Sequence, residues 1–338
     1  MPTAPTFYVV PGSAARRAIE SNRDRVFKAV ETAYRLHASG NAINPDSYFL
    51  RYPDRPNSRI IALPAHIGGP IQKSGIKWIS SFPDNTVDNL ARASAVLILN
   101  DGATGYPVAC IEAALISSTR TAASAALAAE RISPKPFEGT IGVIGTGVIA
   151  RATIEWLLFR NWRFSKVNLF DLDRNGSEQF SNWLRDRYDL DVDIHDDLEG
   201  AISDSSLILF TTTVLQPYLR DEKLFAHNPT VLHLSLRDIC PNVILASQNI
   251  VDDVDHCLKA GTSLHLAEME TGNRDFVAGT LVDVLDNRFA LDFNRPRIFS
   301  PFGLGVLDLA VGDLVLEAAV SSGDSVAFND FFSNSARW

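Results

Sequence analysis

The sequence predicts an α/β protein that combines a doubly wound parallel sheet with a separate α+β domain. From about Gly139 onward, short β-branched apolar runs alternate with helical segments, which is typical of a parallel sheet with helical crossovers. Before that point, apolar runs follow one another with turn residues between them, which indicates antiparallel strands. The segment Ser133-Pro-Lys-Pro136 separates the two patterns. With 338 residues, 46% of them hydrophobic, the chain is long enough for two cores.

The first pattern begins with a short strand at 7–10 and an amphipathic helix that Ser21 would cap and Gly40 would end. Three prolines make the segment 42–57 a loop or an edge strand. An alanine-rich helix is expected at 112–129. The strands expected between these segments are 59–63, 75–80, 95–100 and 106–110, the last two joined by a turn.

The second pattern predicts a sheet with helices at about 148–159, 176–188, 198–203 and 279–285. Its expected strands are 141–144, 166–170, a short one near Val192, 206–211, 230–234, 249–252 and 295–301. We expect the apolar helix at 305–320 to return to the first domain, because the sheet there needs a cover. The predicted domains are therefore 1–134 with about 306–338, and 135–305.

The sequence Gly145-Thr-Gly147-Val-Ile-Ala150 lies between a predicted strand and a predicted helix. Here Gly145 permits a tight turn, Gly147 lets the backbone approach a pyrophosphate, and Ala150 allows close helix packing. The N–H groups of Val148 and Ile149, at the start of the helix, would bind the phosphates. These features predict a Rossmann-type dinucleotide-binding domain. The alternative is a tight turn in a sheet that binds no cofactor.

The next strand ends in Asp171, 24 positions after Gly147, where an acid hydrogen-bonds the ribose hydroxyls of NAD. Asp171 would repel the 2′-phosphate of NADP, although Arg174 could accommodate that phosphate. We therefore expect NAD as the cofactor. Thr212 and Thr213, at the carboxyl end of a later strand, are expected to line the adenosine side of the cofactor groove. The alternative for these threonines is an ordinary β-branched strand end.

Several motifs together resemble the ornithine cyclodeaminase/mu-crystallin family. They are Arg59-Ile-Ile-Ala-Leu-Pro-Ala-His-Ile-Gly-Gly69, Ser74-Gly-Ile-Lys-Trp-Ile-Ser80, Ile116-Ser-Ser-Thr-Arg-Thr-Ala-Ala123 and Leu234-Ser-Leu-Arg-Asp238, besides the glycine motif. The segments Tyr48-Phe-Leu-Arg51 and Ser300-Pro-Phe-Gly-Leu-Gly305 are similar to one branch, the SbnB-type dehydrogenases of 2,3-diaminopropionate biosynthesis. The resemblance covers nearly the whole chain and implies a homodimer formed through the first domain.

The resemblance implies an oxidoreductase that transfers a hydride from the Cα of an amino acid to NAD. For this branch the implied substrate is N-(1-amino-1-carboxy-2-ethyl)-glutamate, which yields 2,3-diaminopropionate and 2-oxoglutarate for siderophore or other natural-product biosynthesis. A separate PLP-dependent synthase would make that substrate. The alternatives are an ornithine cyclodeaminase or related imine reductase, and a non-catalytic NAD(P)H-binding protein of the mu-crystallin kind. The cyclodeaminases have glycines where this chain has Leu236 and Arg237, which argues against the ornithine reaction.

A substrate with several carboxylates needs cations. Lys77 lies within an apolar strand and must meet a counter-charge if buried, although the pattern alone leaves an exposed lysine equally open. The resemblance assigns Lys77 to the substrate carboxylate and to catalysis. It assigns Arg120 to cofactor phosphate or substrate carboxylate, the alternative being a surface arginine. It also makes Arg51 a carboxylate-binding residue, whereas Arg59 could be simple surface charge.

Asp238 follows an apolar strand and matches the catalytic aspartate of the family. At the carboxyl end of the strand it would face the nicotinamide and exchange protons with the substrate amine or with water. Partial burial would raise the pKa of Asp238 towards the working pH. The alternative is a turn or cap acid before Pro241. Pro301 and Phe302 match the loop that closes over the nicotinamide, and the resemblance gives Phe302 a substrate contact.

The net charge of −9 argues against a nucleic-acid or anionic-membrane surface. Three cysteines without a spacing motif fit a reducing compartment, and the N-terminal residues lack the pattern of a signal peptide. We therefore expect a cytoplasmic protein. The segment Asp252-Asp-Val-Asp-His256 is interpreted as a solvated strand end rather than a metal site, because its acids alternate between faces.

Overall fold

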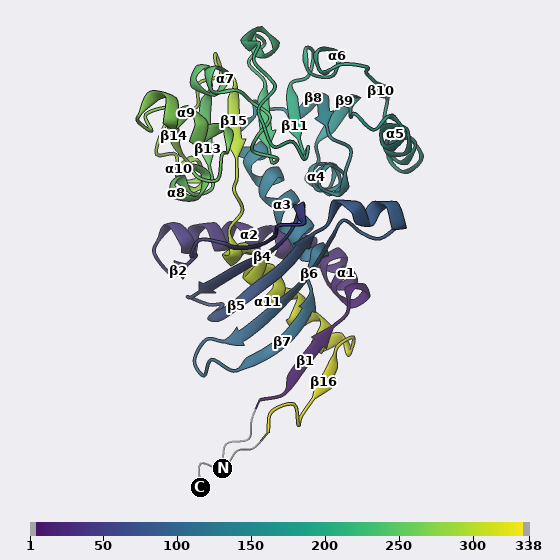
Figure 1. Cartoon of the computed structure of the whole chain (residues 1–338), viewed down its shortest axis with the longest axis vertical. Helices are drawn as coiled ribbons and strands as arrows, with labels where there is room; N and C mark the ends of the chain where they lie inside the picture. The colour runs from purple at the N-terminus through teal and green to yellow at the C-terminus, as the bar shows by residue number, and fades with distance from the viewer. Residues whose placement is uncertain (1–4, 334–338) are drawn as a thin grey trace. The chain divides into compact units, whose positions relative to one another are not determined.

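The computed structural model describes residues 5–333, which form two compact units, each with its own sheet (Figure 1). Unit 1 comprises residues 1–120 and 304–338, and unit 2 comprises residues 121–303. The division falls inside helix α3 (Ala114–Ile132), after Arg120. The sequence instead predicts the division at the proline segment that ends this helix. Prolines mark where a helix ends, but they do not show which unit its last turns pack against.

Unit 1 is built on an eight-stranded sheet in the order β16-β1-β7-β6-β5-β4-β2, with β3 paired to β4. Strands β3 to β7 form antiparallel pairs, as predicted. Strand β1 lies parallel to β7 and antiparallel to β16, and the β1–β16 pair is visible in Figure 1. The strands are β1 (Phe7–Val10), β2 (Ala42–Ile43), β3 (Tyr48–Tyr52), β4 (Arg55–Ile67), β5 (Lys73–Ser81), β6 (Ala93–Asp101), β7 (Pro107–Glu112) and β16 (Val326–Phe328).

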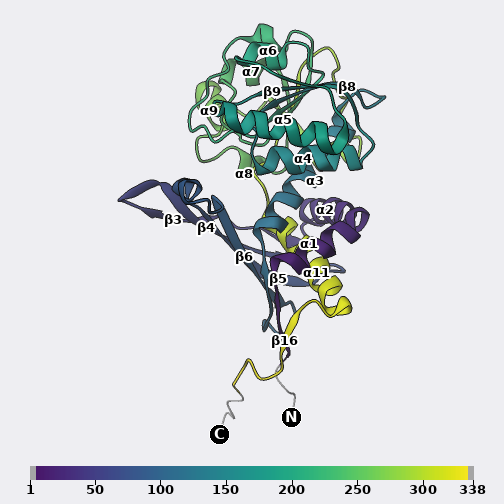
Figure 2. The ribbon, with the colours of Figure 1, turned by 90° about the vertical axis from the view of Figure 1, so that its right-hand side faces the viewer.

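Helix α11 (Gly305–Ser322) packs on the unit 1 sheet together with α1 (Gly12–Ser21) and α2 (Arg23–Ala38). Helix α11 lies in unit 1, the unit to which the sequence predicts its return. A Cβ on Gly312 would overlap the end of the Leu97 side chain, so a larger residue on α11 would force this buried residue of β6 to shift. Figures 1 and 2 show these three helices on one face of the sheet.

The expected start of the first helix was wrong. Ser21 does not cap a helix but ends α1, which the sequence did not predict, and α2 begins after Asn22. The buried face of α1 consists of three alanines and Ile19. A short 3-10 helix (Pro83–Asp88) joins β5 to β6.

Unit 2 contains an eight-stranded parallel sheet in the order β10-β9-β8-β11-β12-β15-β13-β14. Its strands are β8 (Glu138–Ile144), β9 (Arg163–Phe170), β10 (Val192–Ile194), β11 (Leu207–Phe210), β12 (Thr230–His233), β13 (Gln248–Val251), β14 (Val277–Thr280) and β15 (Arg297–Ser300). Its helices are α4 (Val148–Phe159), α5 (Arg174–Tyr188), α6 (Leu198–Ile202), α7 (Pro241–Ala246), α8 (Val254–Cys257), α9 (Ser263–Thr271) and α10 (Leu281–Leu285), with a 3-10 turn at Glu222–Phe225. The predicted α/β class is confirmed, and α4 has the predicted bounds.

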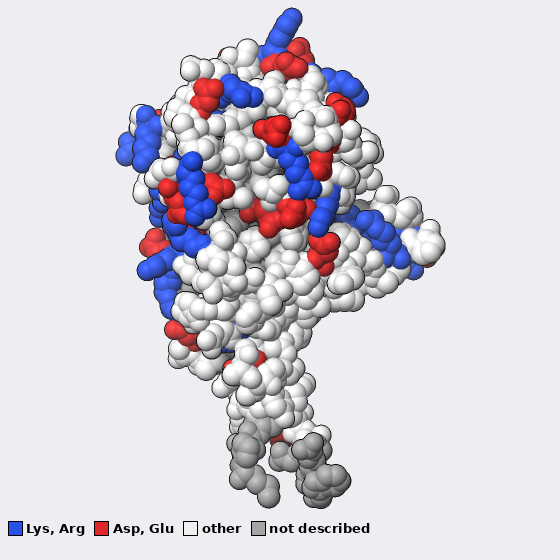
Figure 3. All heavy atoms as spheres, turned by 90° about the vertical axis from the view of Figure 1, so that its left-hand side faces the viewer, with Lys and Arg blue, Asp and Glu red and all other residues white. Residues whose placement is uncertain are grey.

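Charged side chains of both signs lie next to one another on the face drawn in Figure 3. Ion pairs such as Arg274–Glu268 and Arg288–Asp286 neutralise part of the surface charge of unit 2. Among the described residues, no helix is long and apolar enough to cross a membrane.

Candidate functional site

The turn between β8 and α4 requires glycine at Gly145. Gly145 has a φ of +90°, and a Cβ there would lie 2.9 Å from the carbonyl carbon of Thr211. Gly147 differs, because it precedes α4 in an extended conformation and no neighbouring atom lies within 4 Å of where its Cβ would be. Val148 is 73% exposed. The backbone at the start of α4 is therefore accessible to a phosphate group.

A cavity of about 450 Å³ lies beside this turn, within unit 2. Such a volume falls in the range of small-molecule sites. The cavity lies at the carboxyl ends of β8, β9 and β11, where ligands bind in open parallel sheets. Its lining residues are Ile144, Gly145, Gly147, Phe170, Asp171, Leu172, Leu198, Thr211, Thr212, Thr213, Val214 and Tyr218. The structure thus brings together the predicted glycines, Asp171 and both threonines.

Asp171 is hydrogen-bonded to the glycine turn. Its Oδ2 atom accepts hydrogen bonds from the N–H and the hydroxyl of Thr146, at 2.7 and 3.0 Å. Arg174, which could have accommodated a 2′-phosphate, is instead paired with Asp196 at 2.8 Å and with Glu178 at 3.6 Å. The end of β9 therefore carries a net negative charge, which favours ribose hydroxyls over a phosphate.

Asp238 lies in the loop after β12 and is fully buried. Its Oδ1 atom accepts hydrogen bonds from the hydroxyls of Thr212 and Tyr218, and its Oδ2 atom accepts one from the hydroxyl of Ser235. His233 Nε2 lies 3.2 Å from Oδ2 and also 3.2 Å from the backbone nitrogen of Asp238. The ring Nδ1 of His233 contacts the hydroxyl of Ser300, which holds the imidazole from its other side. The carboxylate is thus surrounded by donors.

The predicted rise in the pKa of Asp238 was wrong. Burial alone would raise this pKa, but the hydrogen bonds from His233, Ser235 and Thr212, with the charge interaction of His233, lower it below its ordinary value. The sequence indicates that the strand end is buried, but it does not show which donors the fold places around the carboxylate. Asp238 is therefore a stable anion in this structure.

A second cluster of charges lies in unit 1 and joins β5, α3 and α11. Lys77 Nζ lies 2.7 Å from Asp308 Oδ2 and 3.0 Å from the hydroxyl of Ser117. Arg120 Nε lies 3.1 Å from Asp308 Oδ1, so the two cations share one carboxylate. Lys77 and Asp308 are fully buried, and Arg120 is only 8% exposed. The alternatives of an exposed lysine and a surface arginine were therefore wrong.

Burial lowers the pKa of Lys77 to about 8, and the neighbouring Arg120 acts in the same direction, while Asp308 opposes both. Asp308 is the residue of this cluster that sequence reasoning missed. The available signal was an acidic residue within the apolar run Leu304–Gly312, where an acid needs a buried partner.

Arg51 takes no part in this cluster. It lies exposed on the edge strand β3, with its guanidinium 5.1 Å above the ring of Phe49. The carboxylate-binding role of Arg51 therefore stays a prediction. Arg237 is likewise engaged elsewhere, because it donates a hydrogen bond to the carbonyl of Ala260 at 2.8 Å.

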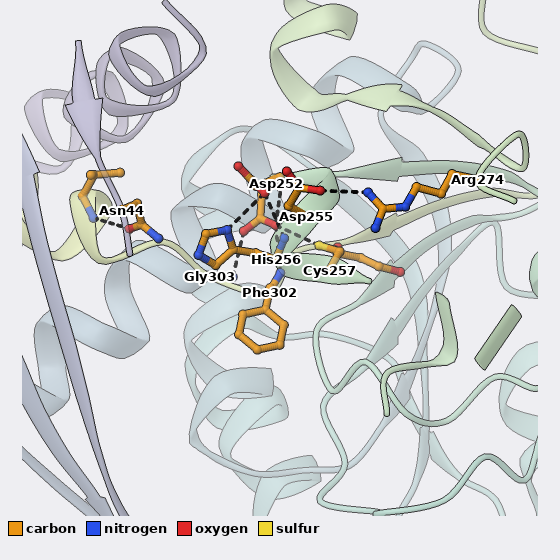
Figure 4. Close-up of polar contacts among 11 residues, drawn as sticks. Asn44, Asp252, Asp255, His256, Cys257, Arg274, Phe302 and Gly303 are labelled. Atoms are coloured by element: carbon orange, nitrogen blue, oxygen red, sulfur yellow. Dashed lines mark hydrogen bonds and ion pairs between the residues drawn. The ribbon is translucent and has the colours of Figure 1, made fainter. Parts of the chain in front are cut away.

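The segment Pro301–Gly303 is anchored by Asp252 at the end of β13. The two carboxylate oxygens accept hydrogen bonds from the N–H groups of Phe302 and Gly303, at 2.9 and 2.7 Å, and Cys257 Sγ donates to Oδ1 at 3.1 Å. In Figure 4 the ring of Phe302 points away from this carboxylate. The interpretation of Asp252 as a solvated residue was wrong, since it is buried against this backbone. No cluster of metal ligands occurs among the described residues.

Comparison with known proteins shows the family of this chain. The model of the ornithine cyclodeaminase/mu-crystallin family matches residues 13–234. The chain belongs to this family. The N-((2S)-2-amino-2-carboxyethyl)-L-glutamate dehydrogenase of Staphylococcus aureus is 32% identical over 256 residues, which are 74% of this chain and 76% of that protein. The alanine dehydrogenase of Archaeoglobus fulgidus is 28% identical over 313 residues, 88% of this chain and 91% of that protein.

A solved structure of an archaeal alanine dehydrogenase dimer with bound NAD supports the same fold. It superposes with a TM-score of 0.85 at 23% identity and covers 97% of this chain and all of that chain. The names of the two relatives give dehydrogenases of different amino acids, a glutamate conjugate and alanine. Membership in the family does not identify the substrate of this chain, which has to be inferred from its own residues.

Proposed function

We propose that this chain is an NAD-dependent dehydrogenase that converts N-(1-amino-1-carboxy-2-ethyl)-glutamate, NAD and water into 2,3-diaminopropionate, 2-oxoglutarate and NADH. The observation that carries the proposal is the buried Lys77–Asp308–Arg120 cluster. Two cations share one carboxylate, so one positive charge remains to attract a substrate carboxylate. The staphylococcal relative, whose name gives this substrate, supports the choice.

The residues of unit 2 fit NAD. Gly147 and the start of α4 would bind the pyrophosphate, Asp171 would bind the ribose hydroxyls, and Thr212 and Thr213 would line the groove. Bound NAD would supply the acceptor for the hydride that leaves the glutamate Cα. The protein itself binds the carboxylates of the substrate, through Lys77 and Arg120, and holds Asp238 as an anion.

A substrate panel followed by NADH absorbance tests the proposal. The enzyme should form NADH with the glutamate conjugate and not with ornithine or alanine. Ammonia release from ornithine without net NADH would instead indicate a cyclodeaminase. Tight NADH binding without turnover of any amino acid would indicate a ligand-binding protein of the mu-crystallin kind.

The proposed substrate requires a preceding reaction that joins a three-carbon amino acid to glutamate. We propose that a PLP-dependent synthase in the cytoplasm catalyses this reaction. Mixing this chain and NAD with such a synthase, phosphoserine and glutamate should yield NADH without added conjugate. No NADH under these conditions, although the chain turns over the purified conjugate, would refute this source of the substrate.

We also propose a homodimer that forms through the open face of the unit 1 sheet. Ala62, Trp78 and Val96 form a cross-strand row on this face, opposite the helices, and Trp78 and Val96 are 44% and 39% exposed. A row of exposed apolar side chains on a sheet is typical of an interface. Trp78→Glu should convert a dimer to a monomer in light scattering, whereas Leu172→Glu, an exposed residue of unit 2, should leave the mass unchanged. A monomeric wild-type protein would refute the proposal.

A further inference from the structure

Tyr218 connects the cavity of unit 2 to Asp238. It lines the cavity next to Thr212 and Thr213, and its hydroxyl donates a hydrogen bond to Asp238 Oδ1 at 3.2 Å. The backbone holds this position, because the N–H groups of Tyr218 and Leu219 both donate to the carbonyl of Asp238, at 3.0 and 2.9 Å. The phenol is therefore fixed to the same segment of chain as the carboxylate that it contacts.

Asp238 itself has no exposed surface. Of its four side-chain donors, Thr212 and Tyr218 line the cavity, whereas His233 and Ser235 contact the other carboxylate oxygen and do not. The carboxylate thus meets the cavity through two hydroxyl groups. The proposed function assigns this cavity to NAD, so a substrate that transfers a hydride to NAD would meet these hydroxyls where it lies against the cofactor.

A phenol that donates its proton to a carboxylate keeps a lone pair with which it can accept a hydrogen bond. Burial and the charge of Asp238 raise the pKa of Tyr218 above its ordinary value, so the phenol stays protonated across the physiological range. The Tyr218 hydroxyl is therefore a fixed acceptor for an N–H or O–H group. The amine of an amino-acid substrate and the water that hydrolyses an imine both carry such a group.

We propose that Tyr218 is the catalytic residue that contacts the substrate amine or the attacking water, and that Asp238 is a positioning residue that acts through it. This inference rests on the proposed dehydrogenase function. The kinetics of variants can distinguish this proposal from a direct role of Asp238. If Asp238 acts through Tyr218, the losses in kcat from replacing the two residues should not multiply.

The test compares Tyr218→Phe, Asp238→Asn and the double variant, with Tyr188→Phe as a matched control. Tyr188 lies at the end of α5, and its hydroxyl accepts a hydrogen bond from Arg187. We expect Tyr218→Phe to lower kcat by about 10- to 100-fold, the range for losing a hydrogen bond in a charged network. The double variant should lose no more than Asp238→Asn alone, and Tyr188→Phe should match the wild type. A Tyr218→Phe variant with kcat within twofold of wild type, or losses that multiply, would overturn the proposal.

A spectroscopic readout separates this inference from the function on which it rests. In ultraviolet titrations, the difference between wild type and Tyr218→Phe should show a tyrosine that ionises well above the ordinary range, and Asp238→Asn should bring its pKa back down. If the wild type fails to oxidise the glutamate conjugate, the proposed function falls, and this titration still tests the Tyr218–Asp238 pair. An ordinary tyrosine pKa at this position would overturn the inference.

Discussion

Lys77 Nζ lies 2.7 Å from Asp308 Oδ2, although the two residues are 231 positions apart in the chain. Asp308 lies on α11, a helix that belongs to unit 1 although it follows all of unit 2 in the sequence. Asp308 also pairs with Arg120, so two cations share one carboxylate. The Lys77–Asp308–Arg120 cluster is therefore completed by α11.

Replacing Asp308 should destabilise the protein strongly. Asp308→Asn leaves two buried cations without a counter-charge, and we expect the free energy of unfolding to fall by about 3 to 5 kcal/mol. Asp313→Asn is the control on the same helix, since Asp313 pairs with Lys73 in a partly exposed ion pair that should contribute less than about 1 kcal/mol. Urea unfolding gives both values. Equal decreases in the free energy of unfolding in the two variants would contradict the prediction that the buried carboxylate contributes more than the partly exposed one.

The affinity for the substrate should depend on the charge of Lys77. Its pKa in the folded protein is about 8, below the ordinary value of 10.5, so Lys77 loses its proton as the pH rises through 8. The neutral amine no longer attracts a carboxylate, and kcat/KM should fall about tenfold per pH unit above that point. Lys77→Arg keeps its charge and should move the fall to higher pH. An unchanged pH profile in this variant would exclude Lys77 as the titrating group.

The two glycines of the turn should respond differently to alanine. At Gly145 a methyl group meets the backbone of Thr211 and an unfavourable φ, so Gly145→Ala should lower the melting temperature as well as NADH binding. At Gly147 there is room within the protein, so Gly147→Ala should fold normally and weaken NADH binding alone. Thermal unfolding and NADH fluorescence measure the two effects. Wild-type NADH affinity in Gly147→Ala would place the pyrophosphate elsewhere.

Asp171 should determine the preference for NAD. Asp171→Ser removes the negative charge at the end of β9, and the ratio of kcat/KM for NAD over NADP should fall at least about tenfold, as expected for a lost charged hydrogen bond. Asp189→Asn, at the far end of α5, is the control and should leave the ratio unchanged. A ratio that stays at the wild-type value in Asp171→Ser would assign the discrimination to other residues.

The glycine turn and its flanking elements were predictable because their signals are local. The bounds of α4 match the prediction, and the cavity contains the predicted Gly145, Gly147 and Asp171. In each of these cases, residue type, spacing and periodicity lie within a few dozen positions of one another.

The partners of the buried charged residues within each unit could not be predicted in this way. Asp308 meets Lys77 only after the chain returns to unit 1, and Tyr218 meets Asp238 through the pairing of two loops. The direction of the pKa shift of Asp238 follows from its contacts with His233, Ser235 and Thr212, whose placement depends on tertiary structure. Sequence patterns show which residues are candidates, whereas long-range contacts determine their partners.

The most direct test of the central proposal uses the glutamate conjugate deuterated at the glutamate Cα. If the enzyme oxidises this carbon, the deuterium should appear in the NADH, with one 2-oxoglutarate formed per NADH. Unlabelled NADH, or consumption of the conjugate without 2-oxoglutarate, would contradict the account.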